Sequence, residues 1–173
     1  ILQIHGGAFA IGDKRDIHLL PFLKGIERDY AVVSVNYRLS GEAIFPAAVQ
    51  DVKAAVRWIR ANQAKYHLDS KRIAACGGSA GGNLAAMLGV TGGTPVFDDP
   101  RSGNLEFSSE VAAVVDWFGP IDFLVMDEQL EQNGFGPSDH SEPSSPESRY
   151  MGAPIREIPE KVKFANPTTY IHP

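Results

Sequence analysis

The sequence has few cysteines, no long apolar stretch and no basic run, and each of these absences excludes a class of protein. A single cysteine among 173 residues excludes an internal disulfide. No apolar stretch approaches the ~20 residues that span a bilayer, so we expect no contact with the membrane interior. Lysine and arginine are scattered without a basic run, and the net charge is −5. A nucleic-acid-binding surface is therefore not expected.

The chain also lacks the features that begin and end a domain. It has no initiator methionine, starts within an apolar run, and closes on "TTYIHP" without a finishing helix. No signal peptide is visible, so a cytoplasmic and a secreted or periplasmic bacterial location both stay open. We expect residues 1–173 to be a partial domain truncated at both ends, which leaves an open sheet edge. Such an edge invites pairing with another chain, and a homodimer is one form of it.

What the sequence does have is an alternation of short apolar runs and helical patterns. The runs that indicate strands are residues 1–4, 31–37, 73–76 and 111–118. The helical patterns are residues 16–28, 46–66 and 84–90, and in the second Val52, Ala55, Val56 and Ile59 share a face. Strands that are apolar throughout and alternate with helices are typical of a parallel sheet covered on both faces. The sequence therefore predicts an α/β fold with a mostly parallel sheet.

The composition changes after Pro120. Residues 123–165 are rich in proline, serine, glycine and charge, and they carry too little apolar pattern for a sheet strand. We interpret them as an insertion or cap-like excursion that lies over the sheet, because loops this long are often functional. A surface excursion without a function is the alternative.

The segment "GGSAGG" at residues 77–82 admits three interpretations. A dinucleotide-binding fingerprint requires G-x-G-x-x-G, but Ser79 stands at the second glycine position. A phosphate-binding Walker A loop requires a lysine and then serine or threonine, where Asn83 and Leu84 stand. Without that lysine, the phosphates of a nucleotide would lose their counter-charge. The first two interpretations are therefore disfavoured.

The third interpretation is a nucleophile elbow, whose pattern G-x-S-x-G is met by Gly77, Ser79 and Gly81. This sharp turn lifts a serine hydroxyl to the edge of the sheet, and bulky neighbours would clash there. The helix that follows points its free N–H groups towards negative charge that develops on a substrate. An apolar run precedes Ser79 and an alanine-rich helical pattern follows it, which is the context that the motif requires. The sequence favours Ser79 as a nucleophile.

A second glycine-rich stretch, "HGGAF", begins at His5 and follows the first expected strand. An elbow serine needs backbone N–H donors for the oxyanion, one of them from the next residue, here Ala80. Small residues let a loop backbone approach the substrate closely, so we expect Gly7 and Ala8 to supply the other donors, with Gly6 shaping the turn. His5 is expected to fix this loop by hydrogen bonds. It is disfavoured as the base, which follows the serine in the chain of this fold.

Five stretches occur in the order "HGGAF", "VVSVNYRL", "FPAAVQDVKAAVRWIRAN", "GGSAGGNLAAML" and "DWFGPIDF". Together they resemble the α/β-hydrolase esterases, nearest the hormone-sensitive-lipase-like and the bacterial feruloyl/acetyl-xylan-type carboxylesterases. The resemblance implies a serine carboxylic ester hydrolase that acts through an acyl-enzyme on short-chain acyl, acetyl or feruloyl esters, with no metal or organic cofactor. Ala8 replaces a third glycine of many lipase-like members and Gly78 an aspartate of others, which favours the feruloyl/xylan-esterase-like branch. The segment 123–165 is then expected to shape the acyl or alcohol pocket.

The chain offers no evident base for Ser79 and no carboxylate to orient one. In the family that it resembles, both come from loops after the next two strands, so we expect a missing C-terminal segment to supply the aspartate and the histidine. By this analogy the local acidic residues and histidines match no triad position. They are Asp116, expected to contact neighbouring loops from a strand end; Asp122, expected to cap a helix from residue 123; Asp139 with an exposed His140; and His172.

Two other functions stay open at this point. A non-catalytic binding module on the same fold would explain the missing base, although the intact elbow and oxyanion loop argue against it. An amidase or peptidase would use the same machinery on a different bond. Without a base from elsewhere, the chain alone is expected to be inactive.

Overall fold

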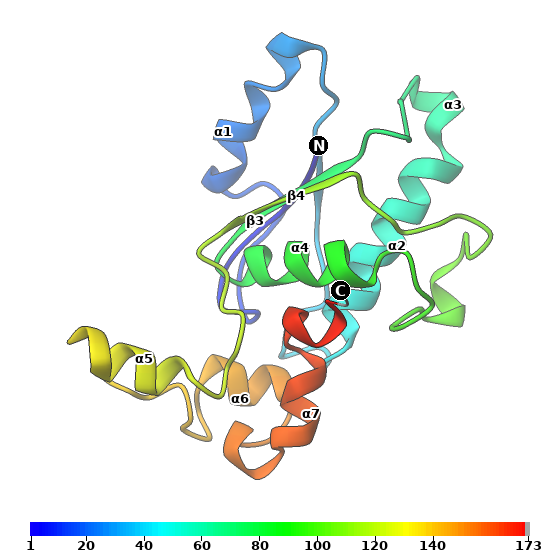
Figure 1. Cartoon of the computed structure of the whole chain (residues 1–173). Helices are drawn as coiled ribbons and strands as arrows, with labels where there is room; N and C mark the ends of the chain where they lie inside the picture. Colours follow the sequence, from blue (N-terminus) through cyan, green and yellow to red (C-terminus); the bar gives the residue numbers. More distant parts are fainter. Residues whose placement is uncertain (172–173) are drawn as a thin grey trace.

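The four strands form one parallel sheet in the order β2-β1-β3-β4. They are β1 (Leu2–Ile4), β2 (Val33–Val35), β3 (Ala74–Gly78) and β4 (Ala113–Trp117). A computed structural model describes residues 1–171 of the chain (Figure 1). Each strand lies within or next to an apolar run of the sequence, and the parallel arrangement confirms the predicted fold class.

Helices lie on both sides of this sheet. In Figure 1, α2 (Ala47–Ala61) and α4 (Ala80–Thr91) lie on one side of the strands and α1 (Leu20–Leu23) on the other. The other helices are α3 (Gln63–Tyr66), α5 (Met126–Asn133), α6 (Pro146–Met151) and α7 (Pro159–Phe164). Short 3-10 turns are η1 (Ile17–Leu19), η2 (Ile26–Arg28), η3 (Pro100–Ser102), η4 (Ile155–Glu157) and η5 (Pro167–Tyr170). None of the helices within residues 1–171 has both the length and the apolar character to cross a membrane.

Two of the expected helices are interrupted. Residues 16–28 form η1, α1 and η2 in place of one helix, since Pro21 is tolerated only in the first turn of α1 and Gly25 follows its end. The long helix expected over residues 46–66 is divided at Asn62, whose φ of −104° and ψ of 10° are not helical. The helix after Ser79 begins at Ala80, four residues earlier than expected, because the glycines there pack closely against the sheet.

The hydrophobic core lies between the sheet and the pair α2 and α4. Leu2 and Ile4 of β1 are fully buried. Val52, Val56 and Ile59 of α2 are buried too, which confirms the predicted apolar face of this helix. Fully burying one such side chain contributes about 1.5–3 kcal/mol. This core fixes the carboxyl ends of β1 and β3 side by side, and both glycine-rich stretches begin at those ends.

The strand β4 is less covered than the sequence predicts. Val115 is 41% exposed and Trp117 45% exposed, and the neighbouring Phe118 is 83% exposed. Within residues 1–171, only Phe22 of α1 places an aromatic ring against Trp117, with the ring centroids 5.2 Å apart. The expectation of helices over both faces therefore holds for β1 and β3 but not for β4.

Residues 123–165 contain helices α5, α6 and α7 and no strand. They lie together at one end of the sheet, towards which the chain leaves β3 (Figure 1). Several of their apolar side chains join the main core, namely Phe123, Tyr150, Met151, Ile155 and Val162. This segment is thus packed against the end of the sheet that carries Ser79.

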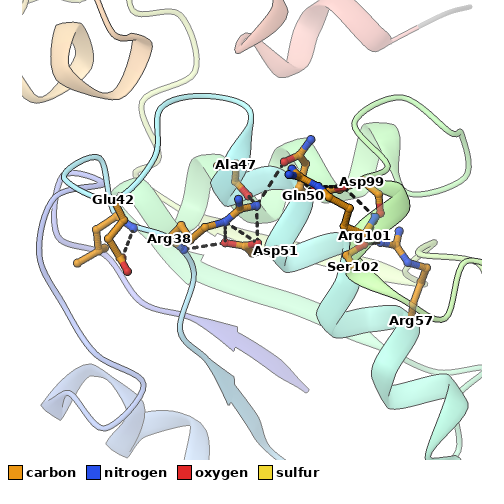
Figure 2. Close-up of polar contacts among 10 residues, drawn as sticks. Arg38, Glu42, Ala47, Gln50, Asp51, Arg57, Asp99, Arg101 and Ser102 are labelled. Atoms are coloured by element: carbon orange, nitrogen blue, oxygen red, sulfur yellow. Dashed lines mark hydrogen bonds and ion pairs between the residues drawn. The ribbon is translucent and has the colours of Figure 1, made fainter.

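Charged side chains of α2 fasten two loops to the body of the sheet (Figure 2). The Arg38 guanidinium, in the loop after β2, makes paired contacts with the Asp51 carboxylate, including Nη2 to Oδ1 at 2.8 Å. The buried Arg57 donates to Asp98 and to the Ser102 hydroxyl, both at 2.7 Å. Bidentate pairs of this kind fix geometry as well as adding energy. These contacts hold α2 to the loop after β2 and to the loop that contains η3.

Candidate active site

Ser79 occupies a sharp turn between β3 and α4. Its backbone has φ of 55° and ψ of −127°, a combination that residues with a side chain rarely adopt. The Ser79 N–H donates to the carbonyl of Trp117 at 2.9 Å, and the Ser79 carbonyl accepts from the N–H groups of Gly82 and Asn83. The turn is therefore held from the sheet on one side and from the helix on the other.

The glycines of this turn leave no room for side chains. A Cβ atom at Gly77 would lie 2.3 Å from the carbonyl oxygen of Gly81. One at Gly81 would lie 2.2 Å from the carbonyl oxygen of Ile4 in β1. Both obstacles are backbone atoms, which cannot rotate away as a side chain can. At Gly78 the nearest obstacle is the Phe118 ring at 3.3 Å, so a larger residue there would need this ring to shift.

The loop after β1 contacts the Ser79 turn directly. A Cβ atom at Gly6 would lie 2.8 Å from the Gly78 carbonyl oxygen, so the two backbones nearly touch. Gly7, Ala8 and Phe9 all have positive φ, of 116°, 53° and 58°. This conformation suits glycine best, which explains why a third glycine would fit at position 8.

Phe9 anchors this loop in the core. Its ring is buried and stacks on the Tyr150 ring with centroids 4.0 Å apart, and the Phe9 carbonyl accepts from the Ser40 N–H at 2.7 Å. The loop backbone is thus preorganised, so substrate binding does not have to order it.

Three backbone donors are left unused where the two stretches meet. Within residues 1–171, the N–H groups of Gly7, Ala8 and Ala80 have no hydrogen-bond acceptor. Ala80 is the first residue of α4, where an N–H has no partner inside the helix. Ala8 and Ala80 line the same cavity as Ser79. Free N–H groups beside a serine are the arrangement that stabilises an oxyanion.

His5 lies buried beneath the loop. Its Nδ1 is 2.7 Å from the Gly6 carbonyl oxygen, and because a carbonyl can only accept, Nδ1 carries the hydrogen. The ring stacks on Tyr37 with centroids 4.4 Å apart, and the Tyr37 hydroxyl donates to the His5 carbonyl at 3.0 Å. Burial raises the pKa of Tyr37, so this hydroxyl keeps its proton. The hydrogen bond to Gly6 and the contacts with Tyr37 therefore both fix the start of the loop.

An open cavity of about 940 Å³ extends from Ser79. Its wall on the sheet side includes Ala8, Ser79 and Ala80, and its other wall comes from residues 118–122 and from the segment 126–147. A second cavity of about 570 Å³ borders Ser79 from the side of α1 and is mainly apolar. Ser79 thus lies between the larger, partly polar cavity and the smaller, mainly apolar one.

The structure corrects two expectations about the local acidic residues and histidines. Asp122 accepts from the Leu124 N–H at 3.0 Å within a turn, and no helix begins at residue 123, since α5 starts only at Met126. His140 is not freely exposed: its side chain is 24% exposed and bonds to a carboxylate. Asp116 contacts the next loop as expected, accepting from the Gly119 N–H at 2.8 Å.

Asp139 is exposed at the rim of the cavity that Ser79 lines. His172 lies outside the described residues.

The carboxylate that holds His140 is Asp127, which the sequence does not single out. Asp127 is buried and accepts from the backbone N–H groups of His140 at 2.9 Å and Ser141 at 3.0 Å, and from His140 Nδ1 at 3.1 Å. Burial works to raise its pKa, but the bonds from Ser141 and His140 outweigh this effect and lower it. A lone aspartate in the first turn of a helix carries no sign of a partner 13 residues further on.

Two other kinds of site find no support in the described part of the chain. Among residues 1–171, no three histidine, cysteine, aspartate or glutamate side chains lie close enough to hold a metal ion. The single cysteine, Cys76, is buried in β3, and burial raises the pKa of its thiol. A buried thiol of this kind is inert as a nucleophile.

Comparison with known proteins gives matches along the whole chain. The family described as BD-FAE matches residues 1–173. Esterase LipQ of Mycobacterium tuberculosis is 30% identical over 172 residues, which cover 99% of this chain and 38% of the relative. The probable carboxylic ester hydrolase LipM of the same organism is 34% identical over 131 residues, covering 75% of this chain and 30% of the relative. The chain thus spans well under half the length of these curated relatives.

Solved structures agree with these matches. The protein described as bifunctional GH43-CE from Bacteroides eggerthii superposes with a TM-score of 0.87 at 37% identity, covering 98% of this chain and 24% of that one. A truncated form of a carbohydrate esterase from gut microbiota superposes with a TM-score of 0.82 at 36% identity, covering 98% and 61%.

Proposed function

The chain belongs to the BD-FAE family, and from this premise we propose that it carries the nucleophile and the oxyanion hole of a serine carboxylic ester hydrolase. Ser79 is the nucleophile, and the N–H groups of Gly7, Ala8 and Ala80 bind the oxyanion. The observation that carries the proposal is the position of three unused N–H donors around a serine in a strained strand-to-helix turn.

The proposed reaction has two steps. The Ser79 oxygen attacks the ester carbonyl, its proton passes to a base, and the carbonyl oxygen gains negative charge that the three N–H groups stabilise. Collapse of this intermediate breaks the bond to the alcohol, which leaves with a proton, and an acyl-serine remains. Water then attacks the acyl-serine, releases the acid and restores the hydroxyl. The base and its carboxylate come from a segment outside these 173 residues.

Acyl esters of carbohydrates are the proposed substrates. Two structures that are more than 35% identical to this chain carry the designation CE or carbohydrate esterase. The open cavity beside Ser79 offers room for a bulky alcohol, and its wall is partly polar. Acetyl and feruloyl groups on plant polysaccharide are the acyl groups that we propose.

A fluorophosphonate probe tests the nucleophile directly. Attack by an activated serine forms a P–O bond and releases fluoride, so the full-length protein is expected to gain one adduct, mapped by peptide mass spectrometry to Ser79. Residues 1–173 expressed alone are expected to stay unlabelled, because no base is present to activate the hydroxyl.

The full-length protein and residues 1–173 alone test two different parts of the proposal, the identity of the nucleophile and the origin of the base. An adduct on a residue other than Ser79 in the full-length protein contradicts the proposal. Stoichiometric labelling of residues 1–173 alone would show instead that a local histidine activates Ser79, so the base would not need to come from another segment.

Substitution of Ala80 by proline tests the oxyanion hole. Proline has no N–H but is accommodated at the first position of a helix, which is where Ala80 lies. We expect kcat for ester hydrolysis in the full-length protein to fall roughly 10²–10³-fold, as for the loss of one oxyanion donor. Circular dichroism must show an intact fold. Unchanged turnover in a folded variant would remove the Ala80 N–H from the oxyanion hole.

A further inference from the structure

The cavity beside Ser79 is lined by a buried glutamate, one carboxyl oxygen of which has no hydrogen-bond partner within residues 1–171. Glu147, in the first turn of α6, lines this cavity and is only 6% exposed. Its Oε2 atom is buried and has no hydrogen-bond partner within residues 1–171. An unpaired buried acceptor destabilises the fold, because it has lost its bonds to water without gaining others. Such a group calls for an explanation, and a bound molecule that completes its hydrogen bonds is one.

His140 lines the same cavity in a fixed orientation. The Asp127 carboxylate can only accept, so Nδ1 of His140 donates to it at 3.1 Å. The backbone N–H groups of residues 140 and 141 donate to the same carboxylate, which fixes the carboxylate beside the ring. The Nε2 atom of His140 is then left for a partner other than Asp127.

The charge of the cavity restricts what its wall can bind. Its described lining includes the carboxyl groups of Asp122, Asp139 and Glu147 but no lysine or arginine among residues 1–171. These carboxyl groups disfavour a phosphate or an acidic sugar at this wall of the cavity. A neutral molecule with several hydroxyl groups fits better, because one hydroxyl can donate to a carboxyl oxygen and another can donate to the Nε2 atom of a neutral His140.

We propose that Glu147 and His140 bind hydroxyl groups of the alcohol part of the ester, and so select neutral polyhydroxylated alcohols such as sugars. This inference rests on the proposed function of Ser79. The wall contributed by residues 126–147 then binds the leaving alcohol. Asp127 is a positioning residue that holds His140 in place.

Two acetate esters that differ only in the alcohol test the proposal. The full-length protein and its Glu147→Leu variant would be compared on an acetylated methyl β-xyloside and on 4-nitrophenyl acetate. We expect kcat/KM for the xyloside to fall roughly ten-fold, as for loss of one hydrogen bond to the carboxyl group. For 4-nitrophenyl acetate, which has no hydroxyl on its alcohol, kcat/KM should change less than about two-fold. Glu147→Gln keeps one acceptor oxygen and should lie between the two.

Controls separate binding from a structural role. Glu131→Leu changes an exposed glutamate on α5 outside the cavity lining and should alter neither substrate. If Glu147 binds substrate, Glu147→Leu should leave the melting temperature unchanged or raise it, because the removed oxygen has no partner in the protein. A fall in melting temperature with an equal loss on both esters would overturn the proposal.

Binding without turnover keeps this inference distinct from the proposed function. Calorimetry with methyl β-xyloside, the alcohol without its acyl group, should show binding to the wild-type protein and weaker binding to Glu147→Leu and His140→Leu. Equal binding to all three proteins would refute the role of the pair even if Ser79 is the nucleophile. Weakened binding in the two variants would support it even if Ser79 were not.

Discussion

Replacing Ser79 with alanine in the full-length protein should lower ester turnover at least about 10⁴-fold, as loss of the nucleophile does in other serine hydrolases. The remaining activity would come from the oxyanion N–H groups alone. The fold should survive, since the bonds that hold the turn run through the Ser79 backbone and not through its hydroxyl. Initial rates with 4-nitrophenyl acetate and the melting temperature are the two measurements.

A matched serine provides the control for this experiment. Ser144 is exposed, lies in the segment 126–147, and its hydroxyl has no partner among residues 1–171. Ser144→Ala should therefore keep full turnover. If Ser79→Ala retains more than about a hundredth of the wild-type rate in a sample free of contaminating esterase, Ser79 is not the nucleophile.

Substitution of Gly81 by alanine is expected to have the largest effect on stability. The added Cβ would lie 2.2 Å from the carbonyl oxygen of Ile4 and 2.7 Å from that of His5, so α4 or β1 must move. Overpacking against rigid backbone is expected to lower the free energy of unfolding by more than about 3 kcal/mol. Urea denaturation measures this loss.

Gly93→Ala is the matched control, because a Cβ at Gly93 meets nothing within 4 Å. It should change the free energy of unfolding by no more than about 0.5 kcal/mol. Ester hydrolysis by the full-length Gly81→Ala variant should fall along with its stability, since β1 leads directly into the loop of the proposed oxyanion donors. Wild-type stability in Gly81→Ala would mean that helix and strand are not in the close contact described here.

The parts of the site that lie close together in the sequence are the parts that the sequence predicts well. The Ser79 turn needs one strand, one helix and small residues between them, and each of these leaves a local pattern. The loop from His5 to Phe9 is equally local. Because both stretches directly follow neighbouring parallel strands, their meeting at one edge follows from the fold class. The helix boundaries at Asn62 and Ala80 were harder, since tertiary contacts decide them.

The wall of the cavity could not be predicted in the same way. His140 and Glu147 line the cavity and Asp127 binds His140, and the three belong to a loop and two different helices with no regular spacing between them. They come together because the segment folds back on itself, and a proline- and serine-rich composition gives no sign of this. His140 was expected in solvent for that reason. Long-range polar contacts of this kind depend on the whole fold and leave little trace in a local pattern.

The backbone of Ser79 has a consequence for how this chain has been selected. A residue held at φ of 55° and ψ of −127° stores about 1–3 kcal/mol of strain. Glycine would adopt that conformation more easily, and the neighbouring positions already show that glycine is available there. A sequence chosen only for resistance to heat would hold glycine at position 79. Under the proposed role of Ser79, the serine retains activity at a cost in stability, and thermostabilising changes should be sought elsewhere in the chain.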